Sequence, residues 1–210
     1  MFNRYMARPK AVSTQGFGAS LERAVKGDGG ASVLLIDLDN LMVLNEAAGR
    51  DAGDKAIAAA VRTLTARAKA EGWTFGRVGG DEFALVAPGI ALEAAFLRAE
   101  RVRSELNAAL RKAIPARFPA SATIGVASVP RDAKTAEQLM RKADLALYAA
   151  KEQGGNAVGL PPPEDMVLRS SYYSRAQLGR LRSLGERLRK KDAALLREAL
   201  DDLLRKYERT

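Results

Sequence analysis

The sequence contains no cysteine, which excludes disulfides, a thiolate nucleophile and a zinc–thiolate site. It contains no histidine either, so the usual general base and the commonest metal ligand are missing. Any chemistry must therefore come from carboxylates, hydroxyls, lysines, arginines and the backbone. A bound metal would need oxygen ligands, which magnesium, manganese and calcium prefer.

Long hydrophobic runs are absent as well. No apolar run approaches the ~20 residues of a membrane span, and residues Met1 to Lys10 have no apolar stretch after their basic residues. We therefore expect no signal peptide, no membrane partner and a cytoplasmic location.

The charge that is present is mainly positive. Lys and Arg number 34 against 25 Asp and Glu, a net charge of +9, and such a balance suggests a polyanionic partner. The excess is concentrated, because Arg169 to Lys191 contains eight Lys or Arg residues and one acid, Glu186. The following stretch, Asp192 to Thr210, is nearly neutral.

Hydrophobic spacing predicts helices and strands in the first 160 residues, after an irregular start at 1–15. The predicted helices cover 20–26, 51–71, 92–113 and 136–153, and the predicted strands cover 32–38, 74–78, 82–87 and 121–129. Gly79-Gly80-Asp81 joins two strands into a hairpin, where we expect the glycines to supply positive φ angles. Helices must then cover a sheet with at least one antiparallel pair, which predicts an α/β or α+β sandwich.

A proline-rich segment, LPPPED at 160–165, divides the chain. Consecutive prolines form a stiff, extended linker. We predict a main domain at 1–159 and a small C-terminal module at 166–210.

Two acidic clusters are candidates for chemistry. Asp37 and Asp39 end the predicted strand 32–38, and residues i and i+2 of a strand point the same way, so both carboxylates could face one site. Asp81 and Glu82 lie at the hairpin tip, where neighbouring glycines leave room for a metal–triphosphate. The simpler alternative is that the first pair begins a turn and the second belongs to an ordinary exposed hairpin.

Four ordered motifs favour the first interpretation. Arg77 to Phe83 reads RVGGDEF, and it is preceded by DLDNLMVLNEAAGRDAGD at 37–54 and followed by SATIGV at 121–126 and ADLALYAAKEQGGN at 143–156. Together they resemble the GGDEF (diguanylate cyclase) family over about residues 15–160. The resemblance implies a nucleotidyl-cyclase-like fold with a central mixed sheet flanked by helices. It also implies condensation of two GTP into cyclic di-GMP, with one GTP held by each protomer.

The resemblance implies a metal site at the acidic clusters. Asp37, the Leu38 carbonyl and Asp81 would hold Mg²⁺ (or Mn²⁺), which would neutralise the triphosphate and activate the attacking 3′-hydroxyl. Asp81 would also accept the proton of that hydroxyl, and Glu82 would support the hairpin. Asp39 would support the metal ligands without contacting the metal itself.

The same resemblance implies a nucleotide site. Asn45 and Asp54 match the positions that read the guanine edge, and an amide and a carboxylate suit guanine because it offers both acceptors and donors. Gly79 and Gly80 would let the triphosphate approach, and Lys151 matches a lysine that contacts phosphate.

The chain departs from the family pattern at four places. Met42 and Gly155 stand where the family usually has a phosphate-binding lysine and arginine. Residues 70–73 (AEGW) replace the RxxD of the product-inhibition site, and TQGF at 14–17 is at most a remnant of the N-terminal DxLT element. A catalytically weak or inactive domain that senses a guanine nucleotide is therefore an alternative to an active cyclase.

The C-terminal module has its own pattern. MVLRSSYY at 166–173 predicts a short strand, Ser174 is a suitable N-cap, and leucines at helical spacing predict two helices separated by residues 189–191. Such a module buries too little apolar surface to be stable alone and needs a partner. A helical hairpin packed on the main domain, or a purely structural dimerisation tail, would satisfy that need.

Residues 172–207 are also similar to the ribbon-helix-helix family, a β-α-α module that binds DNA as a homodimer. In that family a paired β-ribbon enters the major groove and the second helix grips phosphate at its N-terminus. Lys190 and Lys191 would contact phosphate here, and Arg169, Ser171 and Tyr173 could face the bases. The two hypotheses for the whole chain are a diguanylate cyclase coupled to a DNA-binding dimer, and a DNA-binding regulator that responds to guanine nucleotides.

Overall fold

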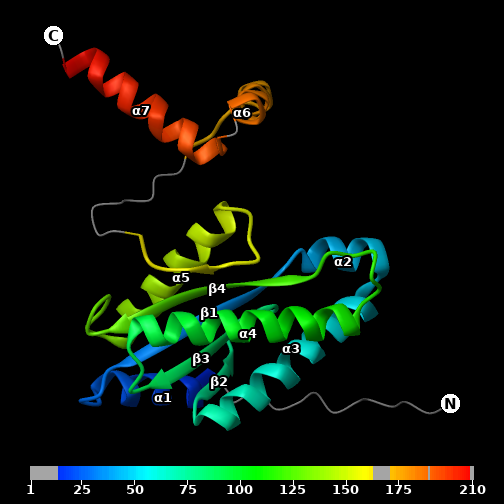
Figure 1. Cartoon of the computed structure of the whole chain (residues 1–210), viewed down its shortest axis with the longest axis vertical. Coiled ribbons are helices and arrows are strands. Elements are labelled where there is room, and N and C mark those ends of the chain that lie inside the picture. Colours follow the sequence, from blue (N-terminus) through cyan, green and yellow to red (C-terminus); the bar gives the residue numbers. More distant parts are fainter. Residues whose placement is uncertain (1–13, 163–170, 189, 209–210) are drawn as a thin grey trace. The chain divides into compact units, whose positions relative to one another are not determined.

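The computed structural model describes residues 14–162, 171–188 and 190–208. The chain forms two compact units, Met1–Pro162 and Pro163–Thr210. The elements, all but β5 labelled in Figure 1, are α1 (Thr14–Lys26), β1 (Ala31–Asp39), α2 (Leu41–Ala48), α3 (Arg50–Glu71), β2 (Thr74–Arg77), β3 (Glu82–Pro88), α4 (Leu92–Ala113), β4 (Ser121–Val129), α5 (Ala136–Glu152), β5 (Val158–Gly159), α6 (Arg175–Leu188) and α7 (Asp192–Glu208).

A mixed sheet forms the centre of the first unit, with the strand order β2-β3-β1-β4-β5. All neighbouring strands are antiparallel except β4 and β5, which are parallel. β1 lies in the middle and is buried along its length up to Asp39, because helices cover both faces. That position explains its continuous apolar sequence, ASVLLIDLD.

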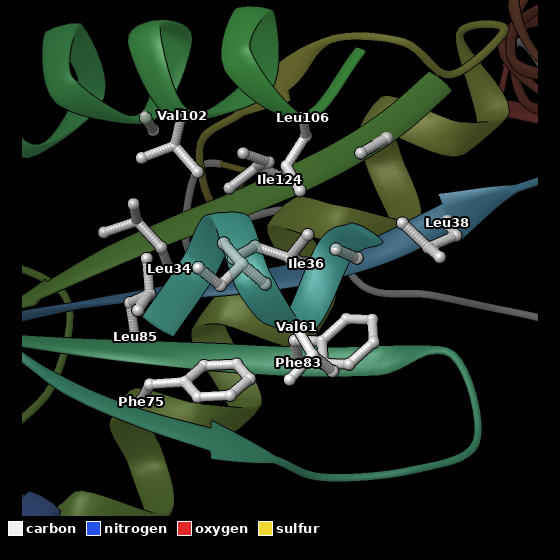
Figure 2. Close-up of a cluster of buried hydrophobic side chains, with 14 of the residues drawn as sticks. Leu34, Ile36, Leu38, Val61, Phe75, Phe83, Leu85, Val102, Leu106 and Ile124 are labelled. Atoms are coloured by element: carbon white, nitrogen blue, oxygen red, sulfur yellow. The ribbon is translucent and has the colours of Figure 1, made fainter. Parts of the chain in front are cut away.

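Alternate residues of β1 point into two separate cores. Leu34, Ile36 and Leu38 pack with residues of α2, α3 and α4 on one face, and Figure 2 shows this cluster with Val61 and Leu106 drawn against the sheet. On the other face, Val33 and Leu35 pack with α1 and α5. Side chains of a strand alternate between its two faces, so Asp37 and Asp39 point to the same face as Val33 and Leu35, which is the α5 side.

The predicted helices and strands of the main domain are present, with two unpredicted short elements and an earlier start of α1. All other ends lie within one residue of the prediction. α1 starts at Thr14 rather than Ser20. Helix α2 and the two-residue strand β5 were not predicted. α2 has only two fully buried residues, Leu41 and Leu44, and therefore carries almost no periodic signal.

The expected reason for the hairpin glycines was wrong. Gly79 and Gly80 are not among the residues with positive φ. A Cβ at Gly79 would lie 2.9 Å from Glu82 Oε2, which is the end of a flexible side chain and can move aside. The hairpin itself is as predicted, with β2 and β3 paired antiparallel.

The second unit contains α6 and α7. Ser174 caps α6, since its Oγ accepts from the Gln177 amide at 3.2 Å and its own amide donates to Gln177 Oε1 at 2.9 Å. Of the predicted strand at 166–173, residues 166–170 lie outside the described residues, and 171–173 form no strand. None of the helices in the described part of the chain combines the length and apolar character needed to span a bilayer.

Candidate functional site

The end of β1 and the tip of the β2–β3 hairpin meet at one edge of the sheet. Because β1 and β3 are antiparallel neighbours, the last residues of β1 lie beside the first residues of β3. Asp37 pairs with Glu82 in the strand register, and the Leu38 amide donates to the Asp81 carbonyl at 3.4 Å. The two acidic clusters, distant in sequence, therefore occupy one place.

Arg77 organises the hairpin tip from the end of β2. Its Nε donates to the carbonyls of Gly79 and Gly80, both at 3.1 Å, and its guanidinium lies 5.9 Å from the centre of the Phe83 ring. The Glu82 carbonyl accepts from the Gly79 amide at 3.2 Å. Sequence reasoning gave Arg77 no role, although its place two residues before Gly79 was the available signal.

Burial and neighbouring charges act together on Asp37. Desolvation raises the pKa of this carboxyl above its ordinary value of 3.8, and the charges of Asp81 and Glu82 add to the increase. The ammonium group of Lys151 on α5 contacts Asp37 Oδ1 and works in the opposite direction, lowering the pKa. Lys151 is the predicted phosphate ligand, and the structure places it directly beside the acidic cluster.

Asp39 is engaged by the protein's own donors. Its Oδ2 accepts from Ser121 Oγ at 2.6 Å, and its Oδ1 accepts from Thr123 Oγ1 at 2.6 Å. The Asn156 amide donates to Asp39 Oδ2 at 3.1 Å. Asp39 therefore joins β1 to β4 and to the loop after α5, while Asp37 alone of the pair faces Lys151.

The predicted guanine readers lie on α2 and α3. Asn45 Oδ1 is buried and has no hydrogen-bond partner within the described part of the chain. Gly53 of α3 packs against this side chain, because a Cβ there would come within 1.9 Å of Asn45 Oδ1. Asp54, the next residue, is exposed. A buried acceptor without a partner is costly in a folded protein, and a ligand that donates a hydrogen bond would remove that cost.

The two departures from the family pattern differ in their surroundings. Met42, on α2, is 71% exposed, so no packing opposes a longer or charged side chain. Gly155 has φ +69°, and a Cβ would lie 3.1 Å from Thr123 Oγ1 and 3.2 Å from Asp39 Oδ1. An arginine at 155 would therefore meet backbone strain and crowding.

The donors at the edge of the sheet suit a hard divalent cation. Carboxylate and carbonyl oxygens are the ligands that Mg²⁺ and Mn²⁺ prefer, and Asp37, Leu38 and Asp81 supply such oxygens close together. No group of three or more acidic side chains within the described ranges is arranged to hold a metal ion. A cation here would need oxygens from the nucleotide as well.

The predicted DNA-contacting residues belong to the second unit. Arg169 lies outside the described residues. Ser171 and Tyr173 precede α6 and are exposed. Lys190 Nζ is 2.6 Å from Glu198 Oε2 of α7, and Lys191 is exposed immediately before that helix.

The family profile described as "Diguanylate cyclase, GGDEF domain" matches residues 10–157. The probable diguanylate cyclase DgcC of Escherichia coli is 36% identical over 126 residues, which are 60% of this chain and 33% of that protein. The response regulator PleD of Caulobacter vibrioides is 33% identical over 140 residues, 66% of this chain and 31% of that protein. The matches thus span about a third of these relatives.

A solved structure has the same fold. The active GGEEF domain of a diguanylate cyclase from Vibrio cholerae superimposes with a TM-score of 0.63 at 27% identity, over 71% of this chain and 94% of that one. A sensory box/GGDEF family protein from Caulobacter crescentus gives a TM-score of 0.59 at 33% identity, over 67% and 93%. The chain belongs to the GGDEF family.

Proposed function

We propose that this member of the GGDEF family condenses two molecules of GTP into cyclic di-GMP. The observation that carries the proposal is the meeting of Asp37, Leu38 and Asp81 at one sheet edge, with Lys151 against Asp37. Each 3′-hydroxyl oxygen would bond to the α-phosphorus of the other GTP, and pyrophosphate would leave. Two GTP thus give one cyclic di-GMP and two pyrophosphates.

Asp37, the Leu38 carbonyl and Asp81 would hold Mg²⁺ or Mn²⁺. When bound, the ion would neutralise triphosphate charge and acidify the attacking hydroxyl. Asp81 is the residue we assign to accept the hydroxyl proton. Glu82 supports the tip, since its carbonyl accepts from the amides of Val78 and Gly79 at 2.9 and 3.2 Å.

The nucleotide would lie between this metal site and α2. Asn45, with its unpartnered Oδ1, would accept from the guanine edge, and Asp54 would accept a second hydrogen bond there. Gly79 and Gly80 add no side chain beside the triphosphate. Lys151 would exchange its contact with Asp37 for a phosphate oxygen once the cation neutralises that carboxylate.

We expect a slow cyclase. With Met42 and Gly155 in place of the two cations, Lys151 alone remains of the three that the family pattern supplies, and each charged hydrogen bond is worth roughly 1.5–3 kcal/mol. We also expect no product inhibition through the family's usual site. There Glu71 pairs with Arg67 at 3.1 Å and with Arg98 at 3.3 Å, so the protein's own side chains occupy that surface.

Two GTP-loaded domains must meet for the reaction, and we assign that task to a homodimer formed by the second unit. Four large apolar side chains of α7 are 47–66% exposed: Leu200, Leu203, Leu204 and Tyr207. A second copy of the unit would cover them. Tethering two half-sites in this way raises their effective concentration.

A second candidate function is a DNA-binding regulator whose first unit responds to guanine nucleotides. The observation that favours it is the charge of α6, which carries Arg175, Arg180, Arg182 and Arg187 and only one acid. Lys190 and Lys191 then precede the start of α7, where helix dipole and cations together attract phosphate. A ribbon-helix-helix dimer would use Arg169, Ser171 and Tyr173 to read bases.

The deciding experiment measures cyclic di-GMP by mass spectrometry after incubating the protein with GTP and Mg²⁺, with and without DNA. Asp81→Ala is the test variant, and Asp144→Ala, an exposed acid on α5, is the matched control. Product that disappears only with Asp81→Ala supports the cyclase, and stimulation by DNA would connect the two units. GTP binding without product under every condition would instead support the regulator.

A further inference from the structure

We propose that Asn156 is a positioning residue, which fixes the end of α5 and thereby the lysine beside the acidic cluster. This positioning role holds whether or not the protein is a cyclase, whereas its consequence for GTP binding rests on the proposed function.

Five residues make up what we call the Asn156 anchor: Asp39, Arg103, Asn107, Thr123 and Asn156. The Asn156 amide donates to Thr123 Oγ1 at 2.9 Å and to Asp39 Oδ2 at 3.1 Å. Its side-chain Oδ1 accepts from Arg103 and from Asn107 Nδ2, both at 2.7 Å. One residue thus joins β1, β4 and α4, three elements of the rigid core.

The two donors from α4 are themselves held in place. Glu100 Oε2 accepts from Arg103 Nε at 3.0 Å and from Arg103 Nη2 at 2.8 Å. Asn107 is 6% exposed, and its Oδ1 accepts from the Ala122 amide of β4 at 3.0 Å. Because other residues also hold both donors, these donors favour one position for the Asn156 side chain.

The segment that this anchor holds is the glycine turn at the end of α5. Gly154 and Gly155, with φ +108° and +69°, separate Asn156 from the last turn of α5. The Gly154 amide donates to the Lys151 carbonyl at 2.9 Å, so the turn transmits the position of Asn156 to Lys151. Lys151 in turn contacts Asp37. The Gly155 amide also donates to the Ala150 carbonyl at 3.1 Å, which closes the turn. The Asn156 anchor holds the far side of this closed turn.

The test uses two substitutions at Asn156, whose φ is +49°. Asn156→Gly keeps this left-handed conformation accessible but removes the side-chain acceptor. Asn156→Asp keeps an acceptor oxygen for Arg103 and Asn107 and also tolerates the conformation. The matched control is Ser128→Ala, which removes a buried hydrogen bond between the same strands β1 and β4 at their other end, to Ser32.

Amide hydrogen exchange of residues 150–156 without nucleotide is the first readout. We expect Asn156→Gly to exchange about tenfold faster in this segment and Asn156→Asp and Ser128→Ala to resemble the wild type there. The second readout is GTP affinity in Mg²⁺, which should fall about tenfold for Asn156→Gly, with KM affected more than kcat.

Unchanged exchange at 150–156 in Asn156→Gly would overturn the positioning role, whatever the activity of the enzyme. Faster exchange with unchanged GTP affinity would overturn its consequence for the nucleotide. A wild type that binds GTP but forms no product would refute the cyclase alone, because exchange and affinity would still decide the role of Asn156.

Discussion

Lys151 of α5 contacts Asp37 of β1, where a buried carboxylate, the hairpin acids and a cation come together. Asp37 is the buried member and Lys151 the more exposed one, with side chains 12% and 39% accessible. The pair partly offsets the cost of burying Asp37 in the protein without metal. It also leaves Lys151 close to any phosphate that a cation would bring to this carboxylate.

The burial of Asp37 predicts a pH-dependent stability of the metal-free protein. Its pKa is raised above 3.8 in the folded state, so its contribution to the free energy of unfolding is fully favourable below that pH and is lost as pH rises through the folded pKa. Asp37→Asn mimics the protonated carboxyl. We expect it to be more stable than the wild type at neutral pH in EDTA, by a margin that shrinks toward acidic pH.

Urea unfolding at several pH values measures this margin, with Asp144→Asn as the control for removing an exposed charge on the same side of the sheet. Added Mg²⁺ and GTP should reverse the order, because they stabilise only the protein that binds them. A stability gain that is independent of pH would contradict the account.

Restoring the cation at position 42 should increase activity. Met42 is 71% exposed, so Met42→Lys disturbs no packing. A regained charged hydrogen bond to phosphate predicts an increase of about tenfold in kcat/KM. Val43→Lys, the exposed neighbour on the same helix, adds equal charge and should give little change. Equal effects of the two would indicate simple electrostatic attraction.

Gly53→Ala should weaken GTP binding. The added methyl would meet Asn45 Oδ1 and must displace the amide or separate α2 from α3. We expect a loss of about 1–3 kcal/mol in the free energy of unfolding and at least about tenfold in GTP affinity. Gly18→Ala, in α1, has no heavy atom within 4 Å of the new Cβ and serves as the control in calorimetric titration.

DNA binding by the second unit should depend steeply on salt. If Lys190 and Lys191 each neutralise a phosphate, replacing both by alanine should reduce the slope of log K against log salt by about two. Lys55→Ala with Lys134→Ala removes the same charge from exposed positions of the first unit. Fluorescence anisotropy with a labelled duplex measures the slope for each double variant. Equal slopes for the two double variants would refute the assignment of Lys190 and Lys191 to phosphate contacts.

Regular elements of the main domain were predictable because their signals are local. The apolar run of β1, the glycines of the hairpin and the amphipathic spacing of α4 each lie within one stretch of sequence. α2 and β5 were missed because eight residues with two buried leucines, and two residues alone, carry too little pattern. The family motifs identified the acidic clusters and the guanine-reading positions as candidates.

By itself, the sequence determined the family, the central mixed sheet and the chemical types available, which are oxygen ligands, lysines and arginines. Only the tertiary structure decided which of these groups meet. The pairing of β1 with β3 places Asp37 beside Glu82, and the packing of α5 brings Lys151 to Asp37. The contacts of Asn156 with Arg103 and Asn107 depend on packing and side-chain direction over long separations, and no local pattern encodes these.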